Sequence, residues 1–247
     1  MYNPFSLEHK KILVTGASSG IGRGISIDTS KMGASLIVTA RNEERLKDTM
    51  SFLEGKDHSY VIADLSFEDD INRIVDSLPV IDGIVLSAGM IKTMPVKNIS
   101  SKAIDEIFDV NIISNIKLLS KLLKRKKLAH SASIVLISSV STFNVKVGNS
   151  LYSSTKGAMN SFAKAMALEV AKLKIRVNCI QPGFIPSIIL NKSGIEEDSM
   201  LRWYAERHPL GFGTPTDIAK ACIYLLSDAA QWVTGSIFTI DGGYTLQ

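Results

Sequence analysis

A tyrosine and a lysine stand four residues apart in the segment Tyr152-Ser153-Ser154-Thr155-Lys156. On a helix, side chains with this spacing lie on one face one turn apart, so the lysine charge can favour the phenolate of the tyrosine. Free tyrosine titrates near pH 10, and ionisation near pH 7 needs stabilisation of the phenolate by roughly 4 kcal/mol. Such a pair suits general acid–base chemistry, although the same two residues taken alone are ordinary surface residues.

A glycine-rich turn near the N-terminus has the residue types of a phosphate-binding loop. It runs Thr15-Gly16-Ala17-Ser18-Ser19-Gly20-Ile21-Gly22 and follows an apolar run at 11–15. Glycines allow the backbone to approach a pyrophosphate, whose charge is met by free N–H groups at a helix N-terminus. The alternative is a turn with only a structural role. The residues expected to bind a dinucleotide here are Gly16, Ser18, Ser19, Gly20, Ile21 and Gly22.

The end of the second apolar run bears on the choice of dinucleotide. It reads Thr39-Ala40-Arg41-Asn42, without the Asp or Glu that would accept a hydrogen bond from a ribose 2′-hydroxyl. The planar guanidinium of Arg41 suits a 2′-phosphate instead, so the sequence favours NADP(H) over NAD(H). A surface arginine paired with Glu43 or Glu44 is the alternative.

Short β-branched runs separated by helical patterns predict the frame that positions these residues. The runs lie at 11–15, 35–40, 59–63, 83–87, 133–138, 175–180 and 236–240. Helices are predicted over 43–53, 66–77, 101–127 and 150–173. Nearly all-apolar strands that alternate with helices indicate a parallel sheet covered on both faces. We therefore expect one α/β domain over residues 1–247 with a doubly wound Rossmann fold and about seven strands.

One of the predicted helices carries an apolar stripe. Within 150–173, apolar residues recur at three- and four-residue spacing, which indicates a core face or a subunit interface rather than a cofactor site. The stripe consists of Met159, Phe162, Ala163, Met166 and Val170.

The composition excludes several classes of protein. The 247 residues are 45% hydrophobic and 21% charged, as in a soluble globular protein rather than a disordered or collagenous one. No apolar run is long enough to span a membrane and no signal peptide is evident, so we expect a cytoplasmic protein without a membrane partner. Cys179 and Cys222 lack metal or redox spacing and are expected to be buried thiols.

The net charge of +4 is a mild excess and gives no indication of a nucleic-acid partner. The densest basic patch is expected to be the solvated end of a helix, where cations complement the helix dipole. It comprises Lys121, Lys124, Arg125, Lys126 and Lys127.

Taken together, the motifs resemble the classical short-chain dehydrogenase/reductase (SDR) family, and among its members those similar to 3-oxoacyl-(acyl-carrier-protein) reductase. The matching segments are TGASSGIG at 15–22, DVNIIS with Asn111, IVLISSVS with Ser139, YSSTK at 152–156 and IRVNCIQPG at 175–183. The resemblance extends from about Leu7 to Tyr244, and the motifs are specific as an ordered set.

The resemblance implies a catalytic tetrad of Asn111, Ser139, Tyr152 and Lys156. Tyr152 would be the general acid in reduction and the base in oxidation. Lys156 would lower its pKa and hold the nicotinamide ribose, with an oxidised nicotinamide adding positive charge nearby, while Asn111 would fix a water in a proton relay. Ser139 would hydrogen-bond the substrate oxygen because the family serine precedes the tyrosine by thirteen residues, and Ser138 is the alternative.

The resemblance also implies further cofactor contacts. Asp64 and Leu65 would meet the adenine, Ala88 and Gly89 the adenosine ribose side, and the nicotinamide end would be met by Pro182, Ile185 and Ser187. The chain departs from the family at Leu86-Ser87-Ala88-Gly89, where Asn-Asn-Ala-Gly is usual. Two supporting amides are thereby lost, and Ser87 can replace part of their hydrogen bonding.

A substrate lid is expected over about 184–210. A second departure, at 208–213, makes the family's substrate loop less transferable to this chain. The apolar residues of the lid have two equally weighted interpretations: they form a hydrophobic wall of the substrate site, or they form the face by which the lid helices pack. Its large apolar residues are Ile188, Ile189, Leu190, Met200, Trp203 and Tyr204.

The expected activity is NADP(H)-dependent interconversion of a ketone and a secondary alcohol. A narrower alternative is reduction of a 3-oxoacyl thioester on an acidic carrier protein, which basic residues would meet. An alternative from another class is a non-catalytic NADP(H) sensor. By resemblance the protein is a homotetramer or dimer built through helices 101–127 and 150–173. The residues proposed to meet the carrier are Lys126, Lys127, Lys172 and Lys174.

Overall fold

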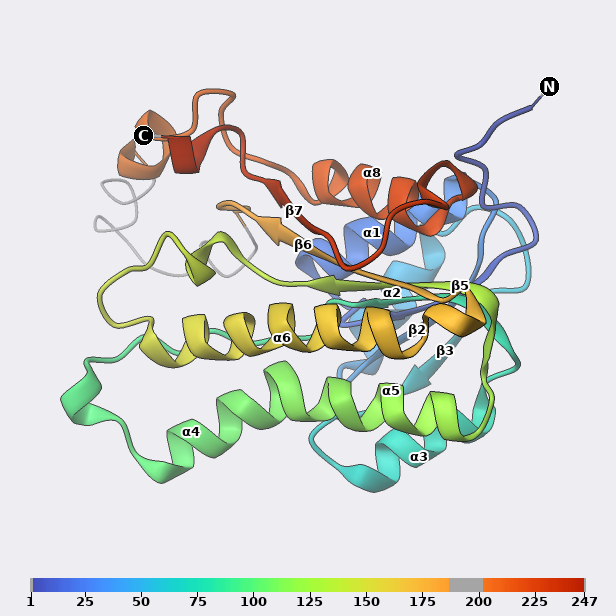
Figure 1. The fold of residues 1–247 in the computed structure, drawn as a ribbon, viewed down its shortest axis with the longest axis horizontal. Coiled ribbons are helices and arrows are strands. Elements are labelled where there is room, and N and C mark those ends of the chain that lie inside the picture. The colour runs from blue at the N-terminus through green and yellow to red at the C-terminus, as the bar shows by residue number, and fades with distance from the viewer. Residues whose placement is uncertain (1, 187–201, 247) are drawn as a thin grey trace.

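A computed structural model describes residues 2–186 and 202–246, which form a single α/β domain around a seven-stranded parallel sheet (Figure 1). The strand order is β3-β2-β1-β4-β5-β6-β7, and every neighbouring pair is parallel. The direction of winding reverses between β1 and β4, where open α/β sheets have their ligand crevice. The strands are β1 Lys11–Thr15, β2 Ser35–Ala40, β3 Ser59–Ile62, β4 Ile81–Leu86, β5 Leu128–Ile137, β6 Arg176–Pro182 and β7 Ile237–Ile240.

Helices cover both faces of the sheet (Figure 1). On one face lie α1 Gly20–Lys31, α2 Glu43–Ser51 and α8 Pro215–Leu226. On the other lie α3 Glu68–Ser77, α5 Ser114–Lys124 and α6 Ser150–Glu169, with α4 Ser101–Phe108 packed beside α6. Residues of one strand alternate between the two cores: Leu13 of β1 packs with α3, α5 and α6, and its neighbours Ile12 and Val14 pack with α1 and α8. The predicted doubly wound fold is confirmed.

The predicted helix over 101–127 is interrupted in its middle. α4 passes at Asp109 into a π-helical turn, Asp109–Ile113, and α5 starts at Ser114. β5 also starts earlier than predicted, at Leu128; its early residues include the exposed His130 and Ser131, and its register with β4 is irregular between Ile81 and Gly83. Neither feature has a periodic apolar signal in the sequence.

The apolar stripe of α6 faces the core. Met159, Ala163 and Met166 are buried against the sheet together with Val170, and Phe162 packs partly against them. The stripe is therefore core packing rather than a subunit interface. The helix itself ends at Glu169 and is followed by a 3₁₀ turn, Ala171–Leu173, so it is shorter than the predicted 150–173.

The thiols and the basic patch lie where the sequence predicts. Cys179 and Cys222 are both buried and free, and burial raises their pKa values, that of Cys179 to about 12. The basic patch closes the last turn of α5, where Lys121 pairs with Glu68 at 2.8 Å and Arg125 pairs with Asp76, both on α3. The patch therefore joins two helices of the domain.

Across 2–186 and 202–246, no helix combines the length and the apolar character needed to cross a membrane. In the same ranges no group of His, Cys, Asp and Glu side chains is placed to hold a metal ion.

Candidate active site

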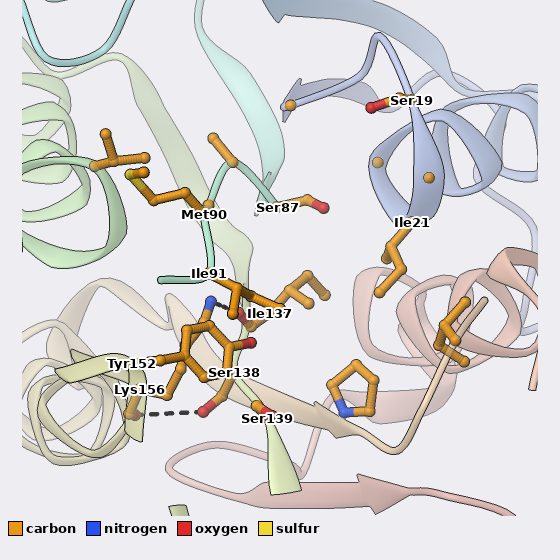
Figure 2. A pocket seen from close by; sticks show the side chains of 18 of the residues that line it. Ser19, Ile21, Ser87, Met90, Ile91, Ile137, Ser138, Ser139, Tyr152 and Lys156 are labelled. Atoms are coloured by element: carbon orange, nitrogen blue, oxygen red, sulfur yellow. Dashed lines mark hydrogen bonds between the residues drawn. The ribbon is translucent and has the colours of Figure 1, made fainter. Parts of the chain in front are cut away.

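One cavity of about 930 Å³ runs along the carboxyl ends of the strands. Figure 2 shows Ser19 and Ile21 of the glycine-rich turn on one side of it and Tyr152 and Lys156 on the other. Asn111 lies behind its wall, and Ser187 falls outside the described residues. The other predicted site residues line the cavity: Gly16, Ser18, Ser19, Gly20, Ile21, Gly22, Arg41, Asp64, Leu65, Ala88, Gly89, Ser138, Ser139, Tyr152, Lys156, Pro182 and Ile185.

The glycine-rich turn has the geometry of an anion cradle. A Cβ on Gly22 would lie 2.3 Å from the carbonyl oxygen of Gly16, so α1 approaches the end of β1 more closely than any side chain allows. Gly20 has a φ of +52°, and a Cβ there would meet no atom within 4 Å, so its surroundings are open. The glycines thus bring the start of α1 to the cavity.

The N-terminus of α1 is left without side-chain partners. Its N-cap, Ser19, makes no side-chain hydrogen bond, and its first turn holds no acidic residue. In α2, by contrast, Asn42 caps the helix and Glu43 and Glu44 lie in the first turn. The first N–H groups of a helix lack intrahelical partners and attract anions, so the residues at this end of the cavity fit the pyrophosphate of a dinucleotide.

Tyr152 and Lys156 lie one turn apart on α6, and both are largely buried. The ammonium of Lys156 donates a hydrogen bond to the carbonyl oxygen of Ile137 at 2.7 Å and lies 5.7 Å from the ring centre of Tyr152 (Figure 2). Burial lowers the pKa of Lys156 to about 8, and the Cys179 thiol acts weakly in the opposite direction. Lys156 is thus held as a costly buried cation on the side of the cavity opposite the glycine-rich turn.

The phenol of Tyr152 is harder to ionise than free tyrosine. Burial raises its pKa, and the Ser139 hydroxyl opposes that shift without cancelling it. Lys156 does not contribute to this shift, and its ammonium is directed to the backbone carbonyl of Ile137. In the chain alone Tyr152 is therefore a proton donor, and its ionisation needs positive charge from elsewhere.

The π-helical turn between α4 and α5 presents Asn111 to the segment after β4. The Asn111 side-chain amide accepts from the Met90 N–H at 2.8 Å and donates to the Met90 carbonyl at 2.9 Å and to the Thr155 hydroxyl at 3.0 Å. The backbone carbonyl oxygen of Asn111 accepts a hydrogen bond from the Asn115 side-chain amide at 2.8 Å. Both N–H groups of the side-chain amide are therefore used within the protein, which fixes the orientation of Asn111.

Comparison with known proteins gives a consistent family. Residues 16–245 match a family model described as enoyl-(acyl carrier protein) reductase. A 3-oxoacyl-(acyl-carrier-protein) reductase of Chlamydia muridarum is 31% identical over 245 residues, 96% of this chain and 98% of that protein. An uncharacterized oxidoreductase of Methylorubrum extorquens is 32% identical over 246 residues, with the same coverage.

A solved structure agrees with the sequence comparisons. The short-chain type dehydrogenase/reductase from Mycobacterium ulcerans superposes with a TM-score of 0.86 at 30% identity, covering 98% of this chain and 92% of that one. The chain belongs to the SDR family. The chain is therefore an SDR oxidoreductase, and its family implies an NAD(P) cofactor.

At the end of the cavity beside β2, Arg41 does not pair with Glu43 or Glu44. Its guanidinium lies 3.6 Å from the carboxylate of Asp64, and its side chain is 74% exposed. Burial would raise the pKa of Asp64, but hydrogen bonds from Ser66 and the charge of Arg41 outweigh it and lower the pKa. Arg45 of α2 lines the same end, and the sequence analysis missed it because nothing in its spacing separates it from a surface arginine.

A residue on another strand supports the backbone at Ser87 and Ala88. The hydroxyl oxygen of Thr15 accepts hydrogen bonds from the backbone N–H groups of Ser87 and Ala88, each at 3.1 Å. Thr15, directly before the glycine-rich turn, thereby ties the end of β4 to the end of β1. These hydrogen bonds come from a side chain on β1, whereas the sequence predicted them from the Ser87 side chain.

The two adjacent serines after β5 point to different partners. The Ser138 hydroxyl donates to the backbone carbonyl of Lys156 at 3.3 Å, and the Ser139 hydroxyl interacts with Ser141 and acts on the Tyr152 phenol. Ser139 is therefore the serine whose hydroxyl acts on the Tyr152 phenol, whereas the Ser138 hydroxyl is directed to the backbone of α6.

Part of the expected lid is described. Ser187, Ile188, Ile189, Leu190 and Met200 lie outside the described residues, whereas 202–206 are helical. His208, which follows, is buried, accepts from the Phe184 N–H at 3.3 Å and stacks on Tyr244 at 4.6 Å. The sequence showed the departure at 208–213 but not that His208 anchors this side of the cavity.

Proposed function

We propose that the protein is an NADP(H)-dependent oxidoreductase that interconverts a ketone and a secondary alcohol. The observation that carries the proposal is that one cavity holds both an anion cradle at α1 and the Tyr152, Lys156 and Ser139 side chains. The dinucleotide, when bound, supplies or accepts the hydride. The protein positions the carbonyl and manages its proton.

Each polar side chain has a distinct task in this proposal. Tyr152 donates its proton to the carbonyl oxygen during reduction and takes a proton from the alcohol during oxidation. Its raised pKa keeps the phenol protonated, as reduction requires. Ser139 donates a hydrogen bond to the same oxygen. The ammonium of Lys156 provides a fixed positive charge near the Tyr152 ring.

The preference for NADP(H) is proposed from two cations at the adenine end. Arg41 and Arg45 both line the cavity where a ribose phosphate would lie, and a guanidinium binds phosphate through paired hydrogen bonds. Asp64 follows β3 rather than β2, and its carboxylate lies 3.6 Å from the Arg41 guanidinium. The pair of arginines therefore supports selection of the phosphorylated dinucleotide.

Fluorescence titration with NADPH and NADH tests this preference. Each charged contact is expected to contribute about 1.5 kcal/mol or more, so Arg41→Ala and Arg45→Ala should each weaken NADPH binding about tenfold and leave NADH binding nearly unchanged. Arg125→Ala, on the far side of the domain, is the matched control. Tighter binding of NADH by the wild type would contradict the proposal.

Reduction of a 3-oxoacyl thioester on a carrier protein is the second candidate. It is favoured by the full-length similarity to 3-oxoacyl-(acyl-carrier-protein) reductases. Lys126, Lys172 and Lys174 are exposed, and Lys127 is half-buried with its ammonium on the Leu78 carbonyl. Activity on a carrier-bound substrate that does not change when the three exposed charges are reversed would argue against the docking part. Enoyl thioesters should be assayed beside the 3-oxoacyl thioesters, since the matched family model is described as enoyl-(acyl carrier protein) reductase.

An assembly of two or four chains is part of the proposal. Ile104, Ile113 and Ile116, on or between α4 and α5, are exposed large apolar residues, and Leu168 of α6 is another. Such a face is stabilised when a second chain covers it. Light scattering of the purified protein measures the assembly, and a monomer would contradict it.

A further inference from the structure

A lysine that the catalytic tetrad does not use lies at the substrate end of the cavity. Lys146, in the loop between β5 and α6, lines the same cavity as Tyr152, together with Tyr204 and Tyr244. Its ammonium is 3.6 Å from the ring centre of Tyr204, 4.7 Å from that of Trp203 and 5.4 Å from that of Tyr244. It also donates a hydrogen bond to the Tyr204 hydroxyl.

This ammonium has a like charge beside it rather than an opposite one. Burial lowers the pKa of Lys146 to about 8, and the nearby positive charge of Arg207 lowers it further, with no acid among the described residues acting against them. Arg207 stacks on Trp203 at 4.1 Å and hydrogen-bonds its carbonyl. At pH 7 the cavity therefore ends in a cation whose surroundings, within 2–186 and 202–246, are aromatic rings and a second cation.

The hydrogen-bonding pattern at Lys146 matches a carboxylate. The Lys146 ammonium has three N–H donors, of which Tyr204 accepts one, and the Tyr204 hydroxyl keeps its own proton for donation. Burial, with Tyr244 adding to it, raises the pKa of Tyr204, so this phenol stays a donor. Two donors on adjacent atoms fit the two oxygens of a carboxylate, and charge-assisted hydrogen bonds of this kind are the stronger ones.

We propose that Lys146 and Tyr204 form a subsite for a carboxylate of the substrate, so that the protein acts on oxo acids and the corresponding hydroxy acids. This inference rests on the proposed function, because it names the substrate class of the same site. A carboxylate at Lys146 would place the reacting carbonyl at Tyr152 by holding the other end of the molecule. It also sets the substrate apart from a thioester, whose acyl group carries no such charge.

The test compares acids with their own methyl esters. The probes are a series of (ω−1)-oxo acids of increasing chain length and the methyl ester of each, assayed by NADPH oxidation. The wild type should show a higher kcat/KM for the acid than for the ester at the matching chain length. Lys146→Met should lower kcat/KM for that acid by about 10- to 100-fold and change that for the ester by less than about threefold, as expected for a lost charge-assisted pair.

Two variants control the comparison. Lys146→Arg keeps the charge and should retain most of the preference for the acid. Lys220→Met removes an exposed lysine of α8 and should leave kcat/KM unchanged for both the acid and the ester. Equal losses on acid and ester in Lys146→Met would show that Lys146 only packs the lid, and equal kcat/KM values for acid and ester in the wild type would overturn the subsite.

Failure of the proposed function has a different signature. In that case no carbonyl compound of the series would oxidise NADPH. The subsite would then be judged by calorimetric binding of the same acids and esters to the NADPH-loaded protein. Tighter binding of acids that is lost in Lys146→Met supports it, and equal binding of acids and esters overturns it.

Discussion

At the scale of single residues, the site holds Lys156 in its disfavoured charged state and Tyr152 in its favoured neutral state. Lys156 is a buried ammonium with one backbone carbonyl as its hydrogen-bond partner, and Tyr152 is a buried phenol with a raised pKa. A buried charge without an opposite charge destabilises the fold, and such groups collect at functional sites. The stability of the protein should therefore depend on the ionisation of Lys156.

Lys156→Met should remove a specific pH dependence of stability. The pKa of Lys156 is about 8 in the fold and 10.5 as its ordinary value. Between these values the unfolded chain binds more protons, so the free energy of unfolding of the wild type should rise with pH, relative to Lys156→Met, by about 1.4 kcal/mol per pH unit. The full interval corresponds to about 3 kcal/mol. Denaturant titrations of both proteins from pH 7 upward measure the difference, and parallel curves would contradict the buried charge.

The residue scale also marks the limit of sequence reasoning. Tyr152, Lys156 and the glycine-rich turn form local motifs, and the structure brings them to one cavity. Lys146, Arg45 and Thr15 were missed because their roles come from contacts with segments far away in the chain. Lys146 lies among the aromatic rings of Trp203, Tyr204 and Tyr244 because their segment packs over the cavity. Sequence spacing does not predict that contact.

At the scale of elements, the carboxyl ends of the strands and the start of α1 define the site. α1 begins where two glycines allow helix and strand to touch, and the π-helical turn places Asn111 behind Met90. π-Helical turns within helices are often found at functional sites. The seven strands and most helices were predicted because apolar periodicity marks them, whereas the π turn and the irregular start of β5 have no such mark.

Two glycine variants separate close packing from backbone conformation in the turn. Gly20→Ala adds a Cβ in open space at a positive φ and should cost about 1–2 kcal/mol of stability. Gly22→Ala puts a Cβ 2.3 Å from a backbone oxygen of Gly16, which must move, so its cost should be larger and NADPH binding should be lost with it. Denaturant unfolding and nucleotide titration measure both, and a smaller cost for Gly22→Ala would contradict the described turn.

At the scale of the whole molecule, a doubly wound sheet brings distant motifs to one edge. The anion cradle follows β1, the arginines follow β2, and the serine and the Tyr–Lys pair come from β5 and α6. The winding reverses beside β1, and this opens the crevice in which both halves meet. The fold and family follow from these features, while the substrate depends on the segment that closes the cavity, where sequence patterns carry little information.

The central claim is that the protein catalyses hydride transfer between a bound dinucleotide and a carbonyl compound, with Tyr152 as the proton donor. The most direct measurement is NADPH oxidation with the panel of carbonyl compounds by wild type and Tyr152→Phe, with nucleotide affinity measured in parallel. We expect turnover by the wild type, a loss of activity of about 10²–10⁴-fold in Tyr152→Phe, and unchanged NADPH binding in that variant. Tight NADPH binding with no turnover by the wild type, or full activity in Tyr152→Phe, would contradict it and favour a nucleotide sensor or a different proton donor.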